Sequence, residues 1–301
     1  MRKPCPPELV TLRDVLRYAV SRFREAKLVF GHGATSAFEE AAFLVLEGLH
    51  LPVDQLDPFL DAHLTHGERE RLAGLIEARI ETRKPAAYLL NKAYIGPMAF
   101  FVDERVIVPR SYLGELMLAG LFEGDDLPFD RDPASIESVL DLCTGSGCLA
   151  LVAAHMFPNA DVDGVDLSEA ALEVAAINLK EHGLEHRVRF HRSDLFSALK
   201  KRRFDLILTN PPYVKAQDVA DFPPEFAAEP VMAHLGGADG LDLVRRILKE
   251  AKKHLAPGGG LLCEVGDARE ALEEAFPHLP FYWLSTENSE AEVFWLGAAD
   301  L

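Results

Sequence analysis

The sequence predicts an α/β domain with a mostly parallel sheet, preceded by a small helical domain and a connecting β-hairpin. Two observations support this prediction. From residue 136 onward, short apolar runs alternate with amphipathic stretches, as in strand–helix–strand units. Residues 11–90 instead repeat their apolar side chains at helical spacing. We therefore divide the chain into a helical substrate-recognition domain at residues 1–92, a β-hairpin and linker at 93–135, and the α/β domain at 136–301.

The helical domain contains two clear helix signals. Ser36 followed by Glu39 resembles a capping box before the apolar run 41–46. A second helical stretch is expected over residues 68–88, with an interruption near Pro85, because proline removes a backbone donor from the helix.

The connecting segment reads as two short strands. The apolar runs 94–98 and 100–108 are separated by a turn and predict a hairpin. A polar loop with prolines is expected at 124–133, ahead of the first strand of the α/β domain.

The α/β domain is expected to alternate strands and helices. Strands are predicted at 139–142, 161–167, 188–193, 204–209 and 260–265, and helices at 148–157, 168–182 and 241–255. Ser168 is the expected N-cap of the second of these helices. Two last apolar runs, 281–284 and 293–296, are expected to pair as an antiparallel edge. This order implies a mostly parallel sheet with helices on both faces.

The composition limits the possible functions. The chain has 301 residues, a net charge of −17 and a pI of about 5.1, so its overall field repels nucleic-acid phosphates, and no direct sequence-specific nucleic-acid binding is expected. Four cysteines form no CxxC and have no histidines at metal-ligand spacing, which predicts reduced thiols in a cytoplasmic protein and no metal site. We find no signal-peptide core and no apolar run of about 18 residues, so no membrane association is expected.

A glycine-containing loop follows the first predicted strand. It consists of Asp141, Leu142, Cys143, Thr144, Gly145, Ser146, Gly147 and Cys148. The two glycines allow a tight turn and a close approach to a ligand, and the N–H groups at the helix start favour a polar or negatively charged group. A dinucleotide-binding loop would carry a third glycine, which is absent here. An acid at position 141 suits an ammonium group, which favours S-adenosylmethionine.

Two further aspartates end the next two predicted strands. Asp166, followed by Leu167, is placed to accept both hydrogens of a ribose diol, and Asp194 is placed to reach an adenine amine, with Leu195 packing on the ring. Each aspartate alone is explained equally well as a helix cap or a solvated strand end. The ordered set favours a cofactor site at the carboxyl ends of the strands, where open α/β sheets bind ligands.

The residues Asn210, Pro211, Pro212 and Tyr213 follow the apolar strand 204–209. A short polar side chain, two stiff prolines and an aromatic ring make a rigid clamp for the planar NH2 group of an amide or an adenine. The side-chain oxygen of Asn210 and the carbonyl of Pro211 would each accept one N–H, and Tyr213 would stack on the plane. A proline pair after a strand is by itself a weak signal.

Together these motifs resemble the class I S-adenosylmethionine-dependent methyltransferases over residues 136–297. The resemblance implies a Rossmann-like seven-stranded sheet with a reversed last strand. It also implies S-adenosyl-L-methionine as methyl donor, S-adenosyl-L-homocysteine as product, and Asn210 with Tyr213 as catalytic residues. Family members with this clamp act on adenine amines or on glutamine amides.

The remainder of the chain resembles the glutamine N5-methyltransferases. The matching residues are Gly96, Phe100 or Phe101, 106–110, Glu229-Pro230, 235–241 and 264–266. The release-factor branch continues Pro109-Arg110 as proline-aspartate-threonine-glutamate, whereas this chain continues with Ser111. A serine here, with 31–33 and 91–93, resembles the branch that methylates a glutamine of ribosomal protein L-three. The implied partner is thus a ribosomal protein, with a release factor as the alternative.

Other interpretations remain open at this stage. An adenine-N6 methyltransferase acting on DNA or RNA would use the same clamp, and a non-enzymatic cofactor-binding regulator would keep the same loop. Arg110 either orients the substrate or forms a salt bridge with Glu115 or another nearby acid. Glu264 either supports the floor of the site or acts indirectly.

Overall fold

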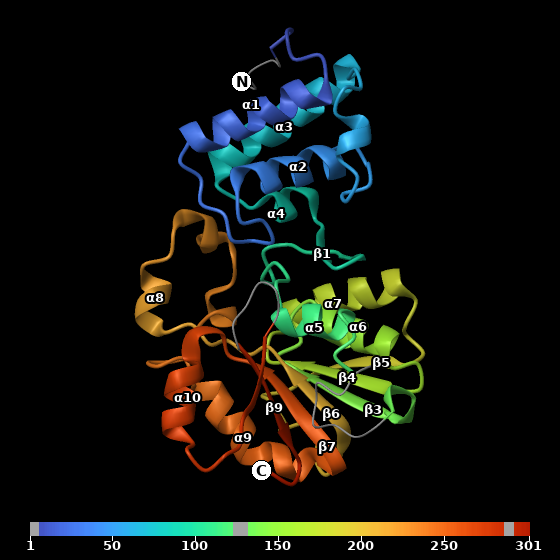
Figure 1. Ribbon diagram of the computed structural model, residues 1–301, viewed down its shortest axis with the longest axis vertical. Coiled ribbons are helices and arrows are strands. Elements are labelled where there is room, and N and C mark those ends of the chain that lie inside the picture. The colour runs from blue at the N-terminus through green and yellow to red at the C-terminus, as the bar shows by residue number, and fades with distance from the viewer. Residues whose placement is uncertain (1–5, 123–131, 286–291) are drawn as a thin grey trace. The chain divides into compact units, whose positions relative to one another are not determined.

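The computed structural model describes residues 6–122, 132–285 and 292–301 (Figure 1). Most of the loop predicted at 124–133 and the N-terminal Cys5 therefore lie outside the described residues. The chain forms two compact units. The first comprises residues 1–93 with 102–104 and 222–228, and the second comprises 94–101, 105–221 and 229–301.

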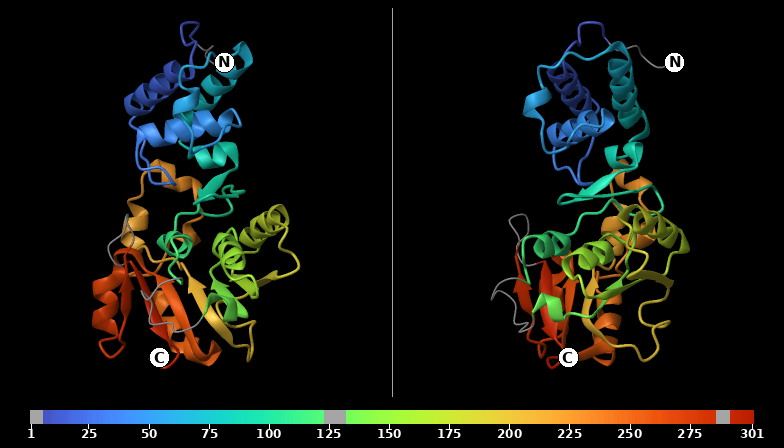
Figure 2. Two further views of the ribbon diagram at one scale, coloured as in Figure 1. Left: turned by 45° about the vertical axis from the view of Figure 1, so that its right-hand side comes forward. Right: turned by 90° about the vertical axis from the view of Figure 1, so that its right-hand side faces the viewer.

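The first unit is helical, as predicted. Its helices are α1 (Leu12–Glu25), α2 (Ala37–Gly48), α3 (His66–Thr82) and α4 (Ala86–Leu90), with a 3-10 turn η1 (Asp57–Phe59). The helices α1, α2 and α3 pack on one another around a shared apolar core (Figure 2). Ser36 caps α2 as expected, but the carboxylate of Glu39 accepts from the backbone N–H and hydroxyl of Thr35, so the reciprocal half of the predicted capping box is wrong.

A buried ion pair fixes these helices. Arg79 on α3 is fully buried and donates through two nitrogens to the carboxylate of Glu40 on α2, at 2.9 and 3.0 Å. The segment 222–228 belongs to this unit because the buried Glu225 accepts from Arg83 and from the backbone of Val29.

The predicted hairpin is shorter than expected. It consists of β1 (Ala93–Ile95) and β2 (Met98–Phe100), with the turn at residues 96–97. The first predicted run, 94–98, therefore contains the turn and the start of β2, and the extension of the second strand to residue 108 is wrong. The N–H of Phe101 donates to the side chain of Asn178, and this bond takes the place of a strand partner. A helix, α5 (Tyr112–Leu118), lies in the segment that we expected to be only a linker, and Ser111 caps it.

The second unit contains a seven-stranded sheet in the order β5-β4-β3-β6-β7-β9-β8. The strands are β3 (Ser138–Leu142), β4 (Asp161–Asp166), β5 (Val188–Arg192), β6 (Phe204–Thr209), β7 (Leu255–Glu264), β8 (Tyr282–Leu284) and β9 (Val293–Gly297). The first five pair in parallel, and β8 and β9 run antiparallel at the edge, as predicted.

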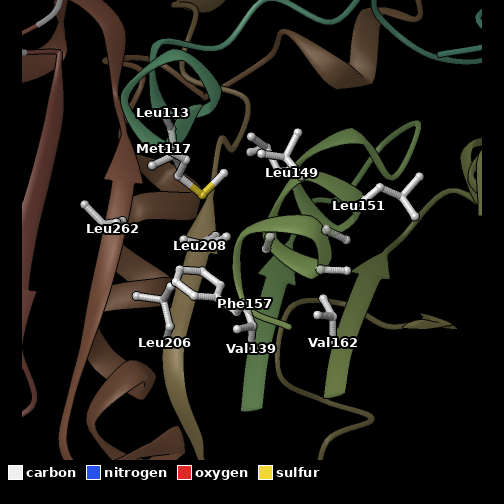
Figure 3. Close-up of a cluster of buried hydrophobic side chains, with 14 of the residues drawn as sticks. Leu113, Met117, Val139, Leu149, Leu151, Phe157, Val162, Leu206, Leu208 and Leu262 are labelled. Carbon is white, nitrogen blue, oxygen red and sulfur yellow. The ribbon is translucent and has the colours of Figure 1, made fainter. Parts of the chain in front are cut away.

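Helices cover both faces of this sheet (Figure 1). They are α6 (Cys148–Met156), α7 (Glu169–His182), α9 (Asp242–His254) and α10 (Arg269–Ala275), together with α5. The short helix α8 (Ala216–Ala220) has no buried residue and lies away from the sheet (Figure 1). The unit also contains the 3-10 turns η2 (Pro133–Ser135), η4 (Val231–Ala233) and η5 (Gly266–Ala268), and a further turn, η3 (Pro224–Ala228), lies in the segment that joins the first unit. On one face, Leu113 and Met117 of α5 and Phe157 pack over strand residues such as Leu206 and Leu208 (Figure 3). On the other face, α9 and α10 bury a second apolar cluster.

The parallel register brings distant loops to one edge of the sheet. Leu142 at the end of β3 pairs with Val165 on one side and Thr209 on the other. Thr209 also donates its hydroxyl to the carbonyl of Leu142 at 3.0 Å. The loops that leave β3, β4 and β6 therefore start side by side.

Candidate functional site

A cavity of about 230 Å³ lies at the carboxyl ends of the strands in the second unit. Its walls come from the loops after four parallel strands, from α9 and from two connecting segments. The lining residues are Cys143, Gly145, Val165, Asp166, Leu167, Ser168, Ala171, Ser193, Asp194, Leu195, Asn210, Pro212, Leu243, Arg246, Arg105, Val106, Ile107, Pro230, Met232 and Ala233.

The cavity contains most, though not all, of the residues expected at the cofactor end. Seven of them line it: Cys143, Gly145, Asp166, Leu167, Asp194, Leu195 and Asn210. Four others are not among the lining residues: Asp141, Thr144, Ser146 and Gly147. Of the residues expected to hold the substrate, Asn210 and Pro212 line the cavity, whereas Pro211, Tyr213 and Arg110 do not.

The two glycines of the first loop differ in their surroundings. Gly145 has φ +55° and faces open space, since a Cβ there would meet no atom within 4 Å. Gly147 has φ +80°, and a Cβ there would lie 2.6 Å from the ring of Phe190. Gly145 therefore keeps the cavity open, and Gly147 allows the start of α6 to pack against β5.

Asp166 connects the loops after β3 and β4. One carboxylate oxygen accepts from the backbone N–H of Gly145 at 2.9 Å and the other from that of Ser168 at 2.8 Å. Burial raises the pKa of this carboxyl group above its usual range. Both oxygens keep further lone pairs beside the cavity, where they can accept from hydroxyl groups.

Asp141 is fully buried behind the loop. One oxygen accepts from the hydroxyl of Thr144 at 2.5 Å and from the N–H of Ala150 at 3.1 Å. The other oxygen, Oδ1, has no hydrogen-bond partner among the described residues. Burial raises the pKa of Asp141 to about 7. Asp141 Oδ1 is therefore a buried oxygen, close in sequence to the two glycines, that can still accept a hydrogen bond.

Asp194 is paired with a residue that sequence analysis missed. Arg246 on α9 donates to one oxygen of Asp194 at 2.8 Å, and both side chains line the cavity and are about half exposed. Position 246 falls within the helix predicted at 241–255, but no motif distinguishes it from the other basic residues of that helix. Only the packing of α9 over the sheet brings it to the cavity.

The clamp residues divide between the cavity and the protein interior. The ring of Tyr213 packs against Gly266, where a Cβ would lie 2.5 Å from the ring. Burial, together with the nearby carboxylate of Glu264, raises the pKa of the Tyr213 hydroxyl above its usual range. The Nδ2 group of Asn210 donates to Glu264 at 3.0 Å.

Arg110 forms an ion pair, and its partner is Glu229. Two guanidinium nitrogens donate to the two oxygens of this fully buried carboxylate, each at 2.8 Å. Glu229 also accepts from the backbone N–H of Val108. The pair holds the segment that contributes Val106 and Ile107 against the segment that contributes Pro230 and Met232, and both segments line the cavity.

The described part of the chain contains neither a membrane-spanning helix nor a cluster of metal-ligating side chains. Within residues 6–122, 132–285 and 292–301, no helix is long and apolar enough to cross a membrane. Across the same residues, no group of three or more histidine, cysteine, aspartate or glutamate side chains could hold a metal ion.

Comparison with known proteins gives a consistent result. Residues 129–225 match the family described as "Methyltransferase small domain". A Bradyrhizobium diazoefficiens protein named "Ribosomal protein uL3 glutamine methyltransferase" is 60% identical over 98% of this chain and 92% of its own length. Proteins of the same name from Burkholderia pseudomallei and Bordetella pertussis are 48% and 50% identical, over 98% and 96% of this chain and 97% and 95% of their own lengths.

The solved structures agree on the fold. A crystal structure titled as a methyltransferase from Pyrococcus furiosus aligns with a TM-score of 0.50 and 19% identity, and covers 74% of this chain and 97% of that one. The seven-stranded sheet with its reversed edge is the Rossmann-like fold of class I methyltransferases, as predicted.

Proposed function

Because this chain belongs to the family of ribosomal protein uL3 glutamine methyltransferases, we propose that it methylates the side-chain amide nitrogen, N5, of a glutamine in ribosomal protein uL3. The methyl donor is S-adenosyl-L-methionine, and S-adenosyl-L-homocysteine is the product. One observation carries this proposal: Gly145 and Asp166 line the same cavity as Asn210 and Pro212, so a donor site and an amide clamp share one space.

The cofactor end fits S-adenosyl-L-methionine. Gly145 leaves open space where the backbone approaches a ligand, and Asp166 offers carboxylate lone pairs to a ribose diol. Asp194, with Arg246 on one of its oxygens, is available to accept from an adenine amine, and Leu195 supplies apolar surface for the ring. Oδ1 of Asp141, buried without a partner in the described chain, is an available hydrogen-bond acceptor for a ligand that bears an ammonium group. When bound, the cofactor supplies an electrophilic methyl group on a positively charged sulfur.

The acceptor end suits a weakly nucleophilic nitrogen. An amide lone pair is delocalised, so the protein must orient it. The side-chain oxygen of Asn210 and the carbonyl of Pro211 would each accept one N–H of the substrate glutamine, which holds the nitrogen in line with the methyl group. Orientation of this kind can contribute several kcal/mol to the lowering of the barrier. The methylated nitrogen then loses one proton to solvent, so no strong general base is needed.

Tyr213 has a supporting role in this proposal. Its ring is held against Gly266, and its hydroxyl lies 3.4 Å from Glu264. It is not among the residues that line the cavity. We propose that it stiffens the clamp and stacks on the substrate amide when the amide enters.

The test compares possible acceptors directly. The purified protein and cofactor with a labelled methyl group are incubated with unmethylated large ribosomal subunits, free uL3, unmethylated release factor, duplex DNA and single-stranded RNA. We expect label in uL3 and a mass increase of one methyl group on one glutamine. Label in the release factor alone, or in nucleic acid, would overturn the uL3 assignment.

A further inference from the structure

Glu264 is a buried carboxylate at the carboxyl end of β7, next to the clamp. It is only 1% exposed. The parallel pairing of β6 with β7 aligns Thr209 with Cys263, so Asn210 and Glu264 leave the two strands side by side. A carboxylate in such a place needs several donors, because its burial without them is costly.

Both oxygens of Glu264 accept hydrogen bonds from the site. Oε1 accepts from Nδ2 of Asn210 at 3.0 Å and lies 3.4 Å from the hydroxyl of Tyr213. Oε2 accepts from the hydroxyl of Ser111 at 2.7 Å and from the backbone N–H of Leu113 at 3.2 Å. The carboxylate therefore joins the start of α5 to two residues of the clamp.

These contacts determine the orientation of the Asn210 amide. Its NH2 group can only donate, and its oxygen can only accept. Both oxygens of Glu264 already accept from other donors, namely Ser111, Leu113 and Tyr213, so the carboxyl group stabilises the orientation in which the NH2 group of Asn210 faces it. The amide oxygen then points away from Glu264. The flipped orientation would set two acceptor oxygens against each other in a buried place.

We propose that Glu264 is a positioning residue that keeps the oxygen of Asn210 toward the acceptor nitrogen, and so selects a carboxamide NH2 over a carboxylate. The inference rests on the proposed function. A glutamine side chain offers N–H groups to that oxygen, whereas a glutamate side chain would oppose an oxygen to it. A flipped Asn210 would reverse this preference.

The main test is Glu264→Gln, which changes few atoms. The new amide must turn its own NH2 group toward either Asn210 or the N–H of Leu113, so it cannot satisfy all the donors that Glu264 satisfies. With unmethylated uL3 as substrate, we expect kcat to fall about 100-fold, as for loss of one positioned polar group. We expect KM and the calorimetric affinity for S-adenosyl-L-homocysteine to change by less than about threefold, because the cofactor loop is untouched.

Asp205→Asn is the matched control. Asp205 is also a buried carboxylate that accepts backbone N–H groups, from Glu137 at 3.0 Å and Ser138 at 3.1 Å. It lies near the start of β6, at the opposite end of the strand that leads into the clamp. We expect Asp205→Asn to lower Tm about as much as Glu264→Gln does, because each removes a buried carboxylate that accepts several hydrogen bonds. We expect kcat of Asp205→Asn to stay within about threefold of the wild type.

A second variant covers the case in which Glu264→Gln does not fold. Ser111→Ala removes one hydrogen bond from the carboxylate and leaves its charge, and should lower kcat about fivefold at unchanged KM. A folded Glu264→Gln with kcat within threefold of the wild type would overturn the inference and leave the function intact, as would equal losses in Asp205→Asn. A wild-type protein that methylates no glutamine would overturn the proposed function itself.

Discussion

The two ends of the cavity are built differently. At the cofactor end, Asp166 binds the N–H groups of Gly145 and Ser168, which lie 21 and 2 residues away in the sequence. At the clamp, Asn210 depends on Glu264, 54 residues away, and Glu264 in turn depends on Ser111, which lies 153 residues before Glu264. The glycine loop is thus held by the loop that follows the adjacent strand, whereas the clamp requires the assembled domain.

This difference has a physical origin. A glycine loop between a strand and a helix can form its turn and its hydrogen bonds locally, since adjacent parallel strands supply both sides. The residues next to Asn210 in the sequence do not decide which way its planar amide group faces. It is decided by whichever buried donor or acceptor the fold brings next to it. Four experiments test this difference.

The largest effect is expected at the clamp. Asn210→Ala should lower kcat by about two orders of magnitude or more, because it removes a positioned acceptor of the substrate N–H. Steady-state kinetics with uL3 measure the loss, and calorimetry should find the affinity for S-adenosyl-L-homocysteine changed by less than threefold. Asn159→Ala, at an exposed position, is the control. Activity within a few-fold of the wild type would contradict the clamp role.

The next test separates the two glycines of the loop. Gly147→Ala should lower the free energy of unfolding by about 2–4 kcal/mol, because its Cβ would meet the ring of Phe190 at a backbone angle that alanine disfavours. Gly145→Ala meets no atom and should cost only about 1 kcal/mol, but its methyl group would enter the cavity and weaken cofactor binding. Denaturant unfolding measures the loss of stability, and calorimetry measures the loss of affinity for S-adenosyl-L-homocysteine. The prediction is contradicted if the two variants lose equal stability and equal affinity.

Asp166→Ala should weaken cofactor binding much more than it lowers kcat. Loss of the carboxylate removes the proposed ribose acceptor and releases the N–H of Gly145, so Kd for S-adenosyl-L-homocysteine should rise about tenfold or more. At saturating cofactor, kcat should change by less than threefold. Asp161→Ala, at the exposed start of the same strand, is the matched control. An unchanged Kd in Asp166→Ala would remove the ribose assignment.

The smallest effect concerns pH and Asp141. Burial raises the pKa of Asp141 to about 7, so the folded protein keeps this proton between pH 5 and 7 while the unfolded chain has lost it. Raising the pH across this window therefore lowers stability, by up to about 1.4 kcal/mol per pH unit from this group. Asp141→Asn lacks the titration, so its stability relative to the wild type should improve as the pH rises from 5 to 7. Unfolding curves at several pH values measure this slope, and parallel slopes for the two proteins would contradict it.

Much of the fold was predictable from local pattern. The helical period of the first unit, the strands around the glycine loop and the antiparallel edge strands follow from apolar spacing and turn residues, and they were confirmed. Helix α5 was missed because its seven residues are too few to show a clear period. The hairpin was overextended because Val102, Val106 and Val108 are buried in a connecting segment rather than in a strand.

The site was only partly predictable. The aspartates and glycines after the strands are visible as an ordered set, and the clamp is visible as a motif. Arg246, Met232 and the ion pair of Arg110 with Glu229 come from segments whose place depends on packing. No sequence pattern marks one of several basic residues on a helix as part of a cavity.

The order of strands and helices, the glycine loop and the motif proposed as an amide clamp can be read from the chain alone, because each depends on residues that are close together in the sequence. Which loop residues line the cavity, and which way the amide of Asn210 faces, depends on the folded domain. Those outcomes depend on buried hydrogen bonds between residues 54 to 153 positions apart, and such bonds form only when the sheet has assembled.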